Sequence, residues 1–178
     1  MYSWQNLTWL FFHKLSLNQE QDKNEYYQTF FNSFKVILPC SFCRNHYIKM
    51  LDEDKNNLKR NINKKNLFHL TIDLHNTVNS KTYKKIWGHV ESDKYYKSFF
   101  LNFETVKKFL HVYVYYNFKK GPVKTEKLFE MLKSFSHIFP RYHVRQKLIE
   151  FQDKVKPNKD NFQKWITAYI LIIRKEMR

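Results

Sequence analysis

Apolar side chains recur every three or four residues along most of this chain, the spacing that places them on one face of an α-helix. In the first half, this spacing predicts helices over residues 3–16, 26–37, 40–50 and 67–83. In the second half, it predicts helices over residues 103–116, 123–138, 142–155 and 162–175. The polar segment 52–65, rich in Asn and Lys, is predicted to be a linker. The fold class is therefore all-α, and the first half is expected to form a compact four-helix bundle.

Glycine is scarce, and this supports the helical prediction. The chain has only two glycines, Gly88 and Gly121, whereas compact β-rich folds need more of them in their turns. Two glycines also exclude a G-x-G-x-x-G or P-loop phosphate cradle, so any nucleotide cofactor must be held in another way. Hydrophobic residues make up 43% of the 178-residue chain, which is enough to bury a sizeable core.

A formal net charge of +16 raises the question of nucleic-acid binding. Lysine is spread along the whole chain, however, without an Arg-rich run or zinc-finger spacing, so a solvated basic surface is expected instead. The most apolar stretch, residues 165–173, is too short to span a membrane, which takes about 20 residues. Residues 1–6 lack the basic and apolar regions of a secretory signal. We therefore expect an intracellular protein that does not enter a membrane.

Both cysteines lie in one C-x-x-C motif, Cys40-Ser41-Phe42-Cys43, directly after Pro39. Proline ends one helix, so Cys40 should begin the next, where free N–H groups and the helix dipole stabilise a thiolate. Two cysteines three residues apart on a first helical turn can form a disulfide. The motif is also compatible with a thioredoxin, but no strand pattern surrounds it. Cys40, Cys43 and His46 with a distant histidine could also hold zinc.

Two further groups of residues suggest a site. His75, Asn76 and Asn79 share one face of the predicted helix over 67–83, which indicates that this helix faces something polar and planar. Trp9 and His13 lie four residues apart on the first helix and can form a wall for a flat ring. Either group alone is also compatible with ordinary packing.

The two halves resemble each other in sequence. Residues 33–44 align without a gap to residues 134–145, with Ser, Phe, Ile, Pro and Arg recurring at equivalent positions. Arg141 and Val144 stand where the first copy has its cysteines. We interpret this as an internal duplication in which the second copy, a C-terminal helical domain, has degenerated. The predicted domains are residues 1–96 and 97–178.

The chain carries Trp9-Leu10-Phe11-Phe12-His13, Leu38-Pro39-Cys40-Ser41-Phe42-Cys43 and His75-Asn76-Thr77-Val78-Asn79, in that order. Together these motifs resemble the Erv/ALR family of FAD-dependent sulfhydryl oxidases, and the resemblance covers residues 4–96. It implies a four-helix bundle with FAD in its mouth and Cys40 and Cys43 as the catalytic pair. It also implies FAD contacts by Trp9, His13, His46, His75, Asn76, Asn79, Lys84 and Tyr96.

The resemblance further implies an activity. Thiol-containing protein substrates, or a dithiol relay protein, would reduce the Cys40–Cys43 disulfide, and FAD would pass the electrons to dioxygen to give hydrogen peroxide. The chain lacks the shuttle disulfide of cellular relatives and in this is similar to the oxidases of large DNA viruses, so we expect it in the host cytoplasm or nucleus, or in the virion. The sequence is compatible with a homodimer. It is equally compatible with a second half that takes the place of the second subunit within one chain. The competing hypotheses are a zinc-stabilised helical binding protein and a basic viral structural or nucleic-acid-binding protein.

Overall fold

The computed structural model describes residues 3–178. Met1 and Tyr2, the first residues of the predicted domain 1–96 and of the segment predicted to lack a secretory signal, lie outside the described residues. Within this range the regular structure is entirely helical, which confirms the all-α prediction. The α-helices are α1 (Trp4–Ser16), α2 (Asn24–Ile37), α3 (Ser41–Asp52), α4 (Leu58–Asn63), α5 (Leu67–Lys81), α6 (His89–Ser98), α7 (Phe103–Asn117), α8 (Pro122–Ile138), α9 (Tyr142–Lys154) and α10 (Phe162–Glu176). Short 3-10 helices, η1 (Gln21–Lys23) and η2 (Asp54–Asn56), precede α2 and α4.

Each of the helices predicted from apolar spacing is present, with bounds that differ by a few residues. The predicted linker over residues 52–65 is wrong, because it contains α4. The Asn57 side chain accepts a hydrogen bond from the Arg60 N–H and so caps α4, while Leu58 and Ile62, four residues apart, bury their side chains. Because this segment is rich in Asn and Lys, its apolar spacing was too weak to predict the short amphipathic helix α4. No element was predicted over α6.

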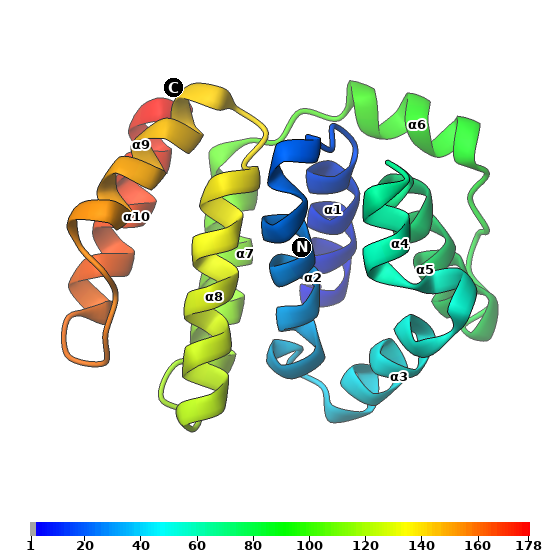
Figure 1. Cartoon of the computed structure of the whole chain (residues 1–178), viewed down its shortest axis with the longest axis horizontal. Coiled ribbons are helices and arrows are strands. Elements are labelled where there is room, and N and C mark those ends of the chain that lie inside the picture. Colours follow the sequence, from blue (N-terminus) through cyan, green and yellow to red (C-terminus); the bar gives the residue numbers. More distant parts are fainter. Residues whose placement is uncertain (1–2) are drawn as a thin grey trace.

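The helices form a layered bundle in which α2 and α8 run side by side through the middle (Figure 1). On one side, α1 and α5 pack together, with α3 crossing below them and α6 above them in this view. On the other side, α9 and α10 pack against each other at the outer edge. Helices from both halves of the sequence therefore meet at the centre of the molecule.

A continuous aromatic core joins the two halves. The rings of Phe11 on α1 and Phe109 on α7 are stacked with their centroids 4.0 Å apart. Phe135 on α8 lies 5.9 Å from Phe109, and all three side chains are fully buried. A polar contact also joins the two halves: Arg145 on α9 donates a hydrogen bond to Glu20, 2.6 Å away. The proposed domains 1–96 and 97–178 thus share one hydrophobic cluster, and their boundary stays a prediction.

The second half repeats the backbone of the first around the shared proline. Leu38 and Phe139, which end α2 and α8, have φ and ψ angles of −56° and 130° and of −59° and 134°. Cys40 and Arg141, the N-cap residues of α3 and α9, both have φ of −93°. The contacts of α2 with α3 and of α1 with α5 are also matched by those of α8 with α9 and of α7 with α10. The predicted duplication therefore has a counterpart in the structure.

Because the core is shared, we expect the chain to unfold in a single transition. Phe109→Ala should lower the free energy of unfolding by about 3–5 kcal/mol, since it leaves a cavity between both halves. Urea denaturation followed by circular dichroism measures this change. The control, Tyr115→Ala on the exposed side of the same helix, should change it by less than about 0.5 kcal/mol. Two separate transitions in the wild type would contradict the expectation.

Candidate redox site

A disulfide joins Cys40 and Cys43 at the start of α3, with their Cα atoms 5.2 Å apart. Pro39 cannot continue α2, and Cys40 then acts as the N-cap of α3. The Cys40 Sγ accepts a hydrogen bond from the Cys43 N–H at 3.1 Å. This contact and the dipole of α3 would both stabilise a thiolate at Cys40 after reduction. Both cysteines are half-buried, whereas Phe42 between them is 78% exposed.

A cavity of about 620 Å³ lies beside the disulfide, bounded by α1, α3, α5 and the loop that follows α5. This is within the usual range for a site that binds a cofactor or a drug-sized ligand. Cys43 lines the cavity, and Cys40 does not. The two cysteines therefore have different surroundings, because only Cys43 is part of the cavity lining.

Aromatic rings form one wall of the cavity. The indole of Trp9 and the imidazole of His75 are stacked with centroids 4.6 Å apart and planes 7° apart. His13 lies behind them, fully buried, with its ring 4.6 Å from that of Tyr96. Two nearly parallel aromatic rings in the lining suit contact with a planar ring system.

Hydrogen bonds determine the tautomers of the two histidines. Thr71 donates its hydroxyl hydrogen to the carbonyl of Phe68 at 2.8 Å, so it accepts from His13 Nδ1, 3.0 Å away. His13 Nε2 then accepts from His75 Nδ1, also at 3.0 Å. This leaves the second nitrogen of His75, Nε2, as a hydrogen-bond acceptor in a residue that lines the cavity.

The electrostatics agree with this arrangement. Burial, followed by the neighbouring His75, holds the pKa of His13 well below its usual value. Burial lowers the pKa of His75 to about 4, with a further contribution from the charge of Lys84. Both rings are therefore neutral at neutral pH, as the chain of hydrogen bonds requires.

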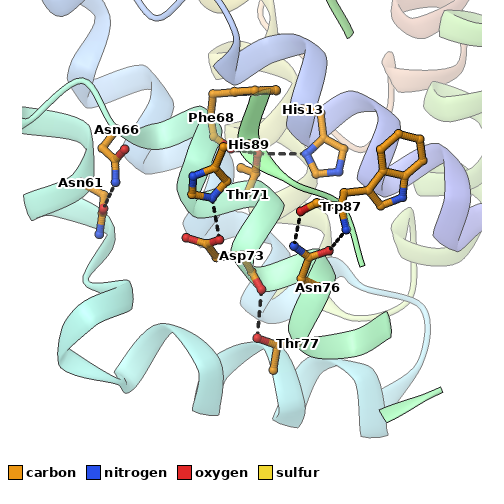
Figure 2. Close-up of polar contacts among 10 residues, drawn as sticks. All are labelled: His13, Asn61, Asn66, Phe68, Thr71, Asp73, Asn76, Thr77, Trp87 and His89. Carbon is orange, nitrogen blue, oxygen red and sulfur yellow. Dashed lines mark hydrogen bonds and ion pairs between the residues drawn. The ribbon is translucent and has the colours of Figure 1, made fainter. Parts of the chain in front are cut away.

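Two asparagine side chains hold the loop between α5 and α6. The Asn76 amide donates to the Trp87 carbonyl at 2.8 Å and accepts from the Trp87 N–H at 2.9 Å (Figure 2). Asn79 donates to the carbonyl of Lys85 at 2.8 Å. These bonds fix the loop against the cavity, where the Lys85 ammonium lies 4.3 Å from the Trp87 ring. The polar face of α5 thus shapes the site through this loop.

The structure brings most of the predicted site residues to the cavity. The predicted residues that line it are Trp9, Cys43, His46, His75, Asn79 and Lys84. Those that do not line it are Cys40, which lies one turn away, His13 and Tyr96, which are buried behind the aromatic wall, and Asn76, which binds the loop backbone. Contact of each with FAD stays a prediction.

Sequence reasoning missed several residues of the cavity. Trp87 and Lys85 follow α5 in a loop without periodicity, so no pattern marked them. Lys81 also lines the cavity and donates to His46 Nε2 at 2.9 Å. Burial and the charge of Lys81 lower the pKa of His46. Lys81 lies in the last turn of α5, and nothing in the sequence separated it from other surface lysines.

Two negative findings concern the described residues. Over residues 3–178, no three His, Cys, Asp or Glu side chains are grouped as metal ligands. None of the helices in that range is both long and apolar enough to cross a bilayer.

An all-α bundle with a C-x-x-C disulfide at the rim of an aromatic cavity defines the class of a helical thiol-redox protein. Residues 6–98 match the Erv1/Alr family, so the chain belongs to that family. This confirms the resemblance based on the three motifs and the fold that it implies.

A relative from Acanthamoeba polyphaga mimivirus is 37% identical over 94 residues. It is named as a probable FAD-linked sulfhydryl oxidase. The match covers 50% of this chain and 65% of the relative, so the chain spans just under two thirds of the relative's length. No solved structure matches the chain significantly.

The buried histidines should make stability depend on pH. Their pKa values are lower in the folded protein than in the unfolded chain, so the unfolded chain binds more protons below about pH 6.5. The free energy of unfolding should therefore fall as the pH is lowered from 7 to 5. His75→Gln should reduce this slope in urea titrations, whereas His143→Gln, at an exposed position, should preserve it. Equal slopes in both variants would contradict the assignment.

Proposed function

We propose that this chain is an FAD-dependent thiol oxidase that forms disulfides in protein substrates through Cys40 and Cys43. The observation that carries the proposal is the asymmetry of the disulfide, because Cys43 lines the cavity and Cys40 does not. Such a pair can exchange with a substrate at one sulfur and deliver electrons to a cofactor at the other. The name of the mimivirus relative supports the same activity.

The residues of the cavity fit FAD. The stacked Trp9 and His75 supply a flat aromatic wall for an isoalloxazine or adenine ring. Lys81, Lys84 and Lys85 add positive charge along one side of the cavity, where a pyrophosphate could bind. A bound flavin supplies a two-electron acceptor beside the disulfide. This arrangement needs no glycine-rich loop, which agrees with the scarcity of glycine.

The cysteines perform the thiol chemistry. A substrate thiolate attacks the Cys40 Sγ, which forms a mixed disulfide and releases the Cys43 thiolate. A second substrate thiol then attacks the substrate sulfur of that mixed disulfide, so the substrate becomes oxidised and Cys40 is released. Cys40 and Cys43 now hold the two electrons. The two electrons leave from the sulfur of Cys43, which lines the cavity, as the Cys40–Cys43 bond forms again.

Further parts of the proposal concern partners and location. Thiol-containing proteins, or a dithiol relay protein, would approach Cys40 past the exposed ring of Phe42. Dioxygen would be the final electron acceptor and would yield hydrogen peroxide. We propose the host cytoplasm or nucleus, or the virion, as the location, because the single C-x-x-C motif is similar to that of the oxidases of large DNA viruses. The resemblance in sequence supports these points, and the question of a homodimer stays a prediction.

The visible spectrum of the purified protein tests the cofactor and the half-reaction together. We expect a flavin absorption band that bleaches when dithiothreitol is added without air and returns when oxygen is admitted. Cys43→Ser should keep the band but reduce oxygen consumption to background, because the sulfur at the cavity is lost. A protein that stays colourless after incubation with FAD would refute the proposal.

Removal of the aromatic wall should weaken flavin binding. Trp9→Ala loses the ring stacked on His75, so the dissociation constant of FAD should rise about tenfold or more. Fluorescence titration of the cofactor-free protein measures this constant. The matched control is Tyr83→Ala, whose side chain is 99% exposed, and it should bind FAD like the wild type. Equal affinity of Trp9→Ala and wild type would place the flavin elsewhere.

A further inference from the structure

The carbonyl groups that precede the redox disulfide need partners from outside α2. Pro39 ends the helix, so the carbonyls of Ile37 and Leu38 are not bonded in an α-helical ladder. Both residues are buried, which makes an unpaired carbonyl costly. Arg44 on α3 donates to the Leu38 carbonyl at 2.6 Å. The partner of the Ile37 carbonyl comes from the other half of the chain.

Asn117, the last residue of α7, donates from Nδ2 to the Ile37 carbonyl at 2.9 Å. Its second amide hydrogen goes to the carbonyl of Tyr113, also at 2.9 Å. The side chain is fully buried, and its Oδ1 has no hydrogen-bond partner. A flipped amide would point Oδ1 at two carbonyl oxygens, so the orientation is fixed. Asn117 thus keeps both Nδ2 hydrogens bonded, and its buried Oδ1 stays without a partner.

One turn earlier on the same face of α7, Tyr113 contacts the wall of the cavity. Its hydroxyl lies 2.5 Å from Thr8 Oγ1 on α1. Thr8 donates its own hydrogen to the Trp4 carbonyl at 2.8 Å, so Tyr113 is the donor in this pair. Thr8 and Trp4 both line the cavity. Residues at i and i+4 of α7 therefore reach two parts of the site from behind.

We propose that Tyr113 and Asn117 are positioning residues, through which the C-terminal half holds the cavity wall and the segment that leads into the Cys40–Cys43 disulfide. The proposal rests on the proposed thiol oxidase function and assigns a role in it to the half that has no cysteine. Tyr113 and Asn117 act through Thr8 and Ile37, and neither lines the cavity.

The consequence is thermodynamic. With the Ile37 carbonyl held, the segment before Cys40 keeps the two sulfur atoms close whether or not they are bonded. Without the Asn117 amide, the reduced segment gains conformations, so closing the disulfide costs more entropy. In glutathione buffers, two glutathione molecules give two electrons and two protons to the disulfide and become glutathione disulfide. Loss of the Asn117 amide should shift this equilibrium toward the Cys40–Cys43 dithiol.

The test measures this equilibrium in glutathione buffers on the cofactor-free 178-residue chain. Asn117→Leu, which has a similar volume and no amide, should lower the equilibrium constant for disulfide formation about fivefold. The control, Tyr169→Phe, removes another buried tyrosine hydroxyl of the C-terminal half, which bonds Ser136 at 2.6 Å. It should leave the constant unchanged. If Asn117→Leu does not fold, Asn117→Ser, which fits the same space, replaces it.

A second readout uses the flavin. Tyr113→Phe should raise the dissociation constant of FAD about threefold to tenfold, and Tyr169→Phe should not. The proposal would be overturned if the glutathione equilibrium is unchanged in the Asn117 variant, or if Tyr169→Phe shifts it equally. The hydrogen bond from Asn117 to Ile37 would then contribute only to packing. Because that equilibrium needs no flavin, it decides the role of Asn117 even if the wild type binds no FAD and the oxidase function fails.

Discussion

The site depends on the chain's inability to continue a helix through Pro39. The missing N–H and the ring of proline end α2 at Ile37, and the next helix begins one residue after Cys40. The Cys40 Sγ therefore caps the helix, and Cys43, in the first turn, lines the cavity. The same break exposes two buried carbonyls, which are satisfied by Arg44 and Asn117. The redox pair and its supports thus follow from one covalent constraint.

The cavity is organised by neutral polar groups within an aromatic wall. Burying His13 without charge is tolerable because Thr71 and His75 satisfy both of its ring nitrogens. Stacking of His75 on Trp9 then sets the orientation of the ring that meets the cavity. The asparagines of α5 act one step further away, since they fix the loop that closes the site. The side chains that would contact FAD are therefore held by hydrogen bonds and ring stacking within the bundle.

The second half keeps the backbone of the first and has changed its chemistry. Arg44 and Arg145 occupy equivalent positions after the shared proline, but Arg44 holds the Leu38 carbonyl, whereas Arg145 pairs with Glu20 across the two halves. Where the first copy has cysteines, the second has Arg141 and the buried Val144. The second half thus supports the site through packing, with α8 along α2 and with α7 in contact with Thr8 and Ile37.

The sequence alone predicted eight of the ten described α-helices, the pairing of Cys40 with Cys43 and the family, because each depends on local order. Apolar spacing predicts amphipathic helices directly, Pro39 places Cys40 at a helix start, and three motifs in fixed order are specific. Tertiary structure decided which residues surround the cavity. Trp87 and Lys85 lie in a loop without periodicity, and α4 was hidden by its polar composition. Asn117 is 80 residues from Ile37, and only the packing of α7 against α2 brings the amide to that carbonyl.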